Sequence, residues 1–167
     1  RKTIEKHFEA ILRELGVDLT DPDFKETPKR LAKMYTQIFH RGSPPRIKTF
    51  PNNGVQELIL VKDLSVITFC PHHIVPVFGK CHVGYIPDKK IVGLSKIARL
   101  VKWYASYPIT QEALTEGIAD EIMKRLEPLG CMVVMELHHG CMKFRGVKDP
   151  DNYTITSAIR GVFAHPP

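Results

Sequence analysis

Apolar residues recur at helical spacing in two segments near the start of the chain, which places them on one face of a helix in each. The first predicted helix covers residues 2–15 and is followed by Gly16. The second begins at Thr27, whose hydroxyl can cap a helix that has Pro28 in its first position. Residues 42–54 are rich in Gly, Pro and Asn, so they predict a loop. The chain is therefore expected to open with two amphipathic helices and a linker.

Beyond this loop, the pattern predicts strands that flank a pair of helices. Runs rich in β-branched and aromatic residues predict strands at 55–61, 64–69, 80–86, 131–137, 142–147 and 153–163. Ser95 and Thr110 each precede apolar residues at helical spacing, which predicts two capped helices. Their inward residues are expected to be Ile97, Leu100, Val101 and Tyr104, then Leu114, Ile118, Ile122 and Leu126. This order favours an α+β fold with a mainly antiparallel sheet.

Composition and charge narrow the class of protein. The 167 residues fit one domain, and 43% hydrophobic with 25% charged residues is the usual globular mix. No stretch approaches the roughly 20 apolar residues that cross a bilayer, and no secretory signal is visible, so we expect a cytoplasmic protein with no membrane partner. The net charge of +6 favours anionic ligands, but the basic residues are scattered, which suits a phosphate pocket better than a nucleic-acid surface.

Thiols and imidazoles gather in two segments that lie far apart in the chain. Residues 70–73 read Cys-Pro-His-His, and residues 138–141 read His-His-Gly-Cys. Zinc prefers thiolate and imidazole ligands, and catalytic zinc sites use three protein ligands and leave the fourth position to water. Cys70, His73 and Cys141 could supply such a set.

Two other interpretations of these residues stay open. An isolated Cys or His is more often a buried thiol or a loop residue, although two such segments together favour a metal. A closed structural zinc site is the stronger rival, and its fourth ligand could come from His72, Cys81, His138 or His139. Neither segment has the C-x₂₋₄-C spacing that is usual in structural sites. We therefore place an open catalytic site first.

Spaced motifs extend along nearly the whole chain, from about residue 2 to residue 163. They are Thr27–Arg30, Cys70–His73, Gly79–Lys80, Gly84–Pro87, Gly93–Arg99, Gln111–Glu112, Cys141–Met142 and Arg145–Val147. In order and spacing these motifs resemble the GTP cyclohydrolase I family, and so many matches are not a coincidence, although each alone would be weak. The resemblance implies the tunnelling fold (T-fold), with N-terminal helices, an antiparallel sheet and a helix pair, assembled into a multi-subunit barrel. By this resemblance, residues 1–167 are expected to form a single domain with a helical arm at 1–42 and a core at 55–167.

The resemblance also implies a reaction. GTP would be converted to 7,8-dihydroneopterin triphosphate and formate, the first step of folate and tetrahydrobiopterin synthesis. Cys70, His73 and Cys141 would bind Zn²⁺, which can make a water molecule nucleophilic at neutral pH. His72 and His139 would transfer protons, a role that suits a side chain with an unperturbed pKa of about 6.5, and His139 would be the donor towards N7 of guanine.

Further residues are implied in substrate binding. Glu112, with Gln111, would contact the guanine edge, although Glu112 taken alone is better explained as an acidic residue at a helix N-terminus. The triphosphate would contact Arg30, Lys33, Ser95, Lys96, Arg99 and Arg145, most of which would singly be solvated surface groups. Arg30 and Lys33 are expected to reach a site shared with a neighbouring subunit, in a homo-oligomer that in this family is typically a decamer.

The chain departs from the family pattern at two places. Pro71 stands where the family usually has Glu, which affects a contact near the zinc. Residues 107–113 lack two arginines that are frequent in relatives, which affects pocket shape or subunit contacts. Two rival functions are a catalytically silent, zinc-stabilised nucleotide-binding or regulatory homologue and a nucleic-acid-binding module. The presence of both His72 and His139 disfavours the first, and the lack of an aromatic-basic stripe disfavours the second.

Overall fold

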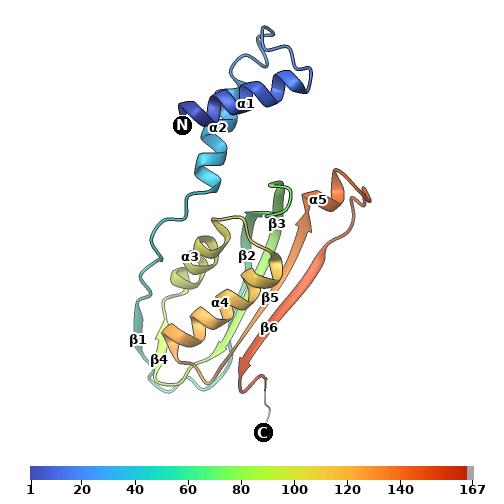
Figure 1. Cartoon of the computed structure of the whole chain (residues 1–167). Coiled ribbons are helices and arrows are strands. Elements are labelled where there is room, and N and C mark those ends of the chain that lie inside the picture. Colours follow the sequence, from blue (N-terminus) through green and yellow to red (C-terminus); the bar gives the residue numbers. More distant parts are fainter. Residues whose placement is uncertain (165–167) are drawn as a thin grey trace. The chain divides into compact units, whose positions relative to one another are not determined.

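The N-terminal unit, Arg1–Arg41, is a pair of packed helices (Figure 1). The computed structural model describes residues 1–164, and in this unit it contains α1 (Lys2–Glu14) and α2 (Thr27–Ile38). The two helices pack on each other, and the rings of Phe8 and Tyr35 stack with their centroids 5.2 Å apart. Both predicted helices are confirmed.

The second unit begins at Gly42 and is built on a four-stranded antiparallel sheet. The strands run in the order β2 (Ile59–Phe69), β3 (Pro76–Ile86), β5 (Gly130–His139) and β6 (Thr154–Gly161). Two short strands, β1 (Thr49–Pro51) and β4 (Lys90–Val92), pair in a separate antiparallel sheet. The predicted α+β class is therefore confirmed.

Two helices, α3 (Leu94–Ala105) and α4 (Gln111–Leu126), cover one face of the main sheet (Figure 1). α3 packs on β2, and α4 packs on β5 and β6. Of the predicted inward residues, only Tyr104 is partly exposed; the others are buried: Ile97, Leu100, Val101, Leu114, Ile118, Ile122 and Leu126. They meet the strand residues Val66, Val77, Cys81, Val83, Tyr85, Val133, Met135 and Leu137. Burial of this apolar surface is the main force that holds the helix pair against the sheet.

Several strand predictions were wrong. Residues 55–61 and 64–69 are not two strands, because the chain from Ile59 is one strand with a bulge at Lys62 and Asp63. The bulge takes the place of the predicted turn, and Asp63 adopts a φ of 58° there. The loop predicted at 42–54 contains β1, whose partner β4 was not predicted.

The strand predicted at residues 142–147 was also wrong. A short helix, α5 (Gly140–Lys143), is followed there by turns in which Gly146 and Lys148 have φ angles of 61° and 52°. The apolar side chains of Phe144 and Val147 are exposed, so no packed sheet face requires this segment to be extended.

Two predicted N-caps were misplaced by one or two residues. Thr27 and Ser95 lie inside their helices, and the cap positions are occupied by Glu26 and Gly93, with no side-chain cap bond at either. In α3 the first turn closes at Gly93, whose carbonyl accepts a hydrogen bond from the Lys96 amide at 2.7 Å. No helix within residues 1–164 has the length and apolar character that crossing a bilayer would require.

Candidate metal centre and active site

A tight connection between β2 and β3 places Cys70 beside His73. The Cys70 amide donates a hydrogen bond to the Val75 carbonyl at 2.9 Å, and the Ile74 amide donates one to the Cys70 carbonyl at 2.8 Å. Ile74 has a φ of 52°, in the left-handed region that reverses the chain. As a result, Cys70 Sγ lies 3.8 Å from His73 Nδ1.

The pairing of β3 with β5 brings the second segment to the same edge of the sheet. Val77 lies opposite His139 in this ladder, so the chain leaves β5 beside the β2–β3 connection. α5 begins there at Gly140, where an added Cβ would lie 2.7 Å from the Pro76 carbonyl oxygen. Glycine therefore permits the close approach that places Cys141 next to the first segment.

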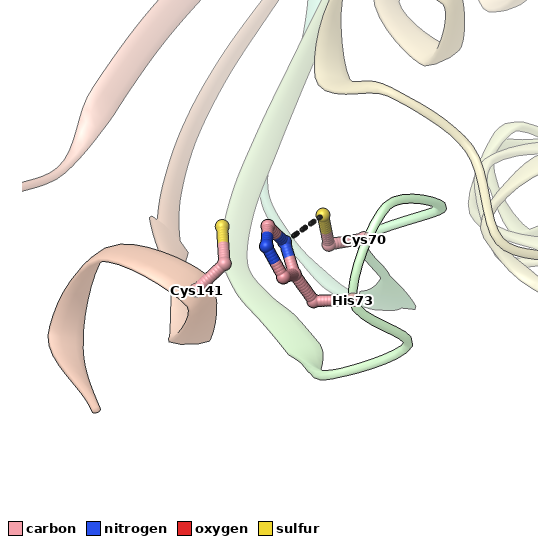
Figure 2. A group of neighbouring side chains, drawn as sticks. All are labelled: Cys70, His73 and Cys141. Atoms are coloured by element: carbon pink, nitrogen blue, oxygen red, sulfur yellow. Dashed lines mark hydrogen bonds between the residues drawn. The ribbon is translucent and has the colours of Figure 1, made fainter. Parts of the chain in front are cut away.

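The side chains of Cys70, His73 and Cys141 point toward one another (Figure 2). One ligand atom from each side chain lies within 4.8 Å of the other two. Within the described residues, these three side chains form the group of thiol and imidazole ligands that could share a metal ion. Zinc–ligand bonds of about 2.0–2.3 Å in tetrahedral geometry separate neighbouring ligand atoms by roughly 3.3–3.8 Å. The 3.8 Å separation of Cys70 Sγ and His73 Nδ1 falls at the upper end of this range. The trio could therefore bind a metal with only small side-chain movements.

Without a cation, ionisation of the Cys141 thiol is disfavoured by its surroundings. Burial, together with a hydrogen bond to Cys70, raises the pKa of Cys141 above its ordinary value. A coordinated metal reverses this effect, because it binds the thiolate and displaces the proton. The electrostatics of the trio thus suit a cation.

A cavity of about 160 Å³ adjoins the trio. Its walls include six residues that the sequence singled out: Cys70, His72, Gln111, Glu112, His139 and Cys141. Pro71, Val77, Ile109 and Thr110 complete the lining. The apolar walls, Val77 and Ile109, were missed as site residues; Val77 would have been found had the alternating pattern of β3 been extended back to Pro76.

His139 and Gln111 are hydrogen-bonded to each other at the wall of this cavity. His139 Nε2 lies 2.7 Å from Gln111 Oε1. Burial lowers the pKa of His139, with a further lowering by His138 and an opposing effect of the Glu112 carboxylate. Glu112 itself is exposed at the start of α4, where the Thr110 hydroxyl accepts a hydrogen bond from the Ala113 amide as predicted for a cap.

The candidate fourth ligands of a closed zinc site differ in how near they lie to the trio. Cys81 is fully buried in the middle of β3, and burial raises its pKa to about 12. His138 belongs to the opposite face of the sheet, where its ring lies between those of Phe78 and Tyr153. His72 and His139 both line the cavity beside the trio. His72 Nδ1 lies 3.7 Å from Cys70 Sγ, whereas His139 Nε2 contacts Gln111.

The predicted triphosphate residues are only partly gathered at this site. Arg145 Nη1 lies 2.9 Å from His73 Nε2, so its guanidinium adjoins the trio. Ser95, Lys96 and Arg99 lie on α3 and are not among the residues that line the cavity. Arg30 and Lys33 are exposed on α2, in the N-terminal unit.

The fold has a known structural counterpart. The apo crystal structure of an archaeosine synthase QueF-like protein superposes with a TM-score of 0.52, at 16% identity, over 62% of this chain and 93% of that one. At this identity the likeness concerns the fold alone, and it agrees with the predicted T-fold. Fold and site together define an α+β protein of the T-fold class with a candidate thiolate–imidazole metal centre at one edge of its sheet.

Sequence comparison identifies the family within this class. The family model of GTP cyclohydrolase I matches residues 4–167. GTP cyclohydrolase 1 of Carboxydothermus hydrogenoformans is 44% identical to this chain, over 98% of this chain and 88% of its own length. The enzyme of Desulforamulus reducens is 47% identical over 96% of this chain and 88% of its own length. The enzyme of Aquifex aeolicus is 46% identical over 98% of this chain and 89% of its own length. The chain belongs to the GTP cyclohydrolase I family.

Proposed function

We propose that this protein is a zinc-dependent enzyme that converts GTP to 7,8-dihydroneopterin triphosphate and formate. The observation that carries the proposal is the convergence of Cys70, His73 and Cys141, from two distant segments, beside a cavity that His72 and His139 also line. Membership of the GTP cyclohydrolase I family supports the choice of substrate and reaction.

The trio would hold the zinc ion, and the two histidines would move protons. Zinc, when bound, lowers the pKa of a water molecule to about 7 and so supplies the nucleophile for C8 of guanine. His139 faces the cavity and would deliver a proton towards N7. His72, beside the Cys70 sulfur, would serve the water and ribose steps. The apolar walls formed by Val77 and Ile109 would keep other water away from these groups.

Recognition of GTP would divide between the base and the triphosphate. The Glu112 carboxylate would accept hydrogen bonds from the ring NH and amino group of guanine, a pair of donors that adenine lacks. Six basic or hydroxyl side chains would contact the phosphates: Arg30, Lys33, Ser95, Lys96, Arg99 and Arg145. We further propose that the arm at 1–42 and the core at 55–167 act as one domain in a cytoplasmic homodecamer, in which Arg30 and Lys33 reach a neighbouring subunit's site.

The test is turnover by the zinc-loaded, assembled protein. GTP should yield equal amounts of formate and a pterin that becomes fluorescent on oxidation, whereas ATP should yield neither. Binding of GTP without formate, at full zinc content, would instead favour a catalytically silent homologue.

A pair of adjacent histidines provides a matched control. His139→Ala should abolish pterin formation and leave zinc bound, because His139 lines the cavity but is not one of the trio. His138→Ala should retain turnover, because His138 belongs to the opposite face of the sheet, between Phe78 and Tyr153. Loss of zinc from His139→Ala would show that this histidine is a ligand.

A further inference from the structure

The orientation of the Gln111 side-chain amide is fixed by two backbone carbonyls. Gln111 Nε2 lies 2.9 Å from the Thr154 carbonyl oxygen and 3.3 Å from the Met135 carbonyl oxygen. A carbonyl oxygen only accepts hydrogen bonds, so the NH₂ group of the amide must face both of them. The amide oxygen, Oε1, is therefore directed the other way.

This orientation determines which nitrogen of His139 carries a proton in the neutral ring. Gln111 Oε1 is an acceptor, and it lies 2.7 Å from His139 Nε2, so Nε2 must be the donor. The other ring nitrogen, Nδ1, is left for a partner other than Gln111. The tautomer is thus set by a chain of contacts that begins at backbone atoms of β5 and at the start of β6.

The burial of Gln111 limits what else its side chain can do. Gln111 is 2% exposed, although it contributes to the cavity wall beside the exposed Glu112. Both amide hydrogens are used by the two carbonyls, and the oxygen is used by His139. A direct hydrogen bond to guanine would require this network to break and would leave a buried polar group unpaired, which is unfavourable.

We propose that Gln111 is a positioning residue, which holds His139 as the Nε2–H tautomer, so that Nδ1 is the nitrogen that first accepts a proton from the attacking water and then passes it to the substrate. This inference rests on the proposed function and changes the role predicted for Gln111 from base contact to orientation of the proton-transfer histidine. The principle is the one by which outer hydrogen bonds orient histidines in metal sites, where their loss typically costs about 10–100-fold in activity.

The experiment uses zinc-loaded, full-length protein and three variants. Gln111→Met keeps the length of the side chain but removes the acceptor. Gln111→Glu puts a carboxyl oxygen against the Thr154 and Met135 carbonyls, which favours the neutral acid; its O–H can then donate to a carbonyl while its C=O accepts from His139. Thr115→Val is the matched control, because Thr115 is buried one turn along α4 and bonds to the Gln111 carbonyl and to Thr156, but not to the Gln111 amide. ¹⁵N-histidine NMR without GTP reports the tautomer of His139, and steady-state kinetics report kcat and KM for GTP.

Wild-type protein should show His139 protonated at Nε2 in its neutral form. Gln111→Met should lose this preference, with kcat lowered about 10–100-fold and KM changed by less than about threefold. Gln111→Glu should keep the tautomer and recover part of kcat, and Thr115→Val should keep both.

Three results would overturn the proposal. One is an Nδ1–H tautomer in the wild type, which also decides the matter if Gln111→Met does not fold. Another is an unchanged tautomer in folded Gln111→Met, which would mean that the residue is only structural. The third is an effect of Gln111→Met mainly on KM, which would indicate contact with the base. Absence of wild-type turnover would overturn the proposed function instead, and the tautomer measurement, made without GTP, would still stand.

Discussion

The four cysteines divide into two pairs with different chemical surroundings. Cys81 and Cys131 are fully buried in the sheet, and burial raises their pKa to about 12 and about 11. At pH 8 less than about one in a thousand of these thiols is therefore ionised, and the thiolate is the reactive form. Cys70 and Cys141 line the cavity instead.

We predict that alkylation will separate these pairs. Iodoacetamide at pH 8 should modify Cys70 and Cys141 after a chelator removes the bound metal, whereas Cys81 and Cys131 should react only in denaturant. Peptide mass spectrometry before and after chelation measures this. Equal labelling of Cys81 in the folded, metal-loaded protein would contradict the assignment.

Zinc content provides a second prediction for the same residues. Cys141→Ser should lower bound zinc from about one ion per chain to near zero, because two remaining ligands hold the ion poorly. Cys81→Ala is the control: it should cost stability through a small cavity in the core but retain the metal. Metal analysis after gel filtration gives the ratio, and a Cys141→Ser protein that keeps its zinc would exclude Cys141 as a ligand.

At the scale of residues, the sequence was informative where chemistry alone defines a site. Cys70, His73 and Cys141 could be proposed because zinc prefers thiolate and imidazole ligands, and the structure brings these three side chains together. The contact between Gln111 and His139 could not be predicted in this way. It depends on the register that places Met135 and Thr154 around the start of α4, which is a property of the folded sheet.

Among the elements, the helices were easier to predict than the strands. The inward residues of α3 and α4 follow from a period that the sequence repeats over several turns. The strands have shorter patterns, so the sequence predicts a turn where the bulge at Asp63 lies and a strand in the exposed run ending at Val147. In both cases, strand formation depends on which side of the segment packs against the rest of the protein, and the sequence of the segment alone does not contain this information.

The N-termini of α3 and α4 give a prediction at this scale. Thr110 caps α4 by accepting a hydrogen bond from the Ala113 amide at 3.3 Å, whereas Ser95 lies inside α3, whose N-cap position is occupied by Gly93. Thr110→Ala should therefore lower the free energy of unfolding by about 1 kcal/mol. Ser95→Ala should change it by less than about 0.5 kcal/mol. Urea unfolding curves measure both, and equal losses would mean that the cap bond does not stabilise α4.

For the molecule as a whole, the main sheet has two unequal faces. One is covered by α3 and α4 (Figure 1). The other carries large apolar side chains that are 41–68% exposed: Leu60, Ile67, Phe78, Ile155 and Ile159. Strands β2 and β6 are the outer members of this sheet. Several large exposed apolar side chains on one face of a sheet are typical of a surface that another subunit covers.

The proposed homo-oligomer would bury this face, and a charge placed on it tests that idea. Ile67 is 68% exposed in the isolated chain, so Ile67→Glu costs little in the folding of one chain, but burial of its carboxylate between subunits would be unfavourable. Light scattering after gel filtration should show a mass that is a multiple of 19.0 kDa for the wild type and a smaller assembly for Ile67→Glu. Lys124→Gln, exposed on the helix-covered side, changes the net charge by the same amount and should leave the mass unchanged. Zinc content per chain should be equal in all three proteins, because Cys70, His73 and Cys141 lie within one chain. A wild-type protein with the mass of a single chain would contradict the proposed oligomer.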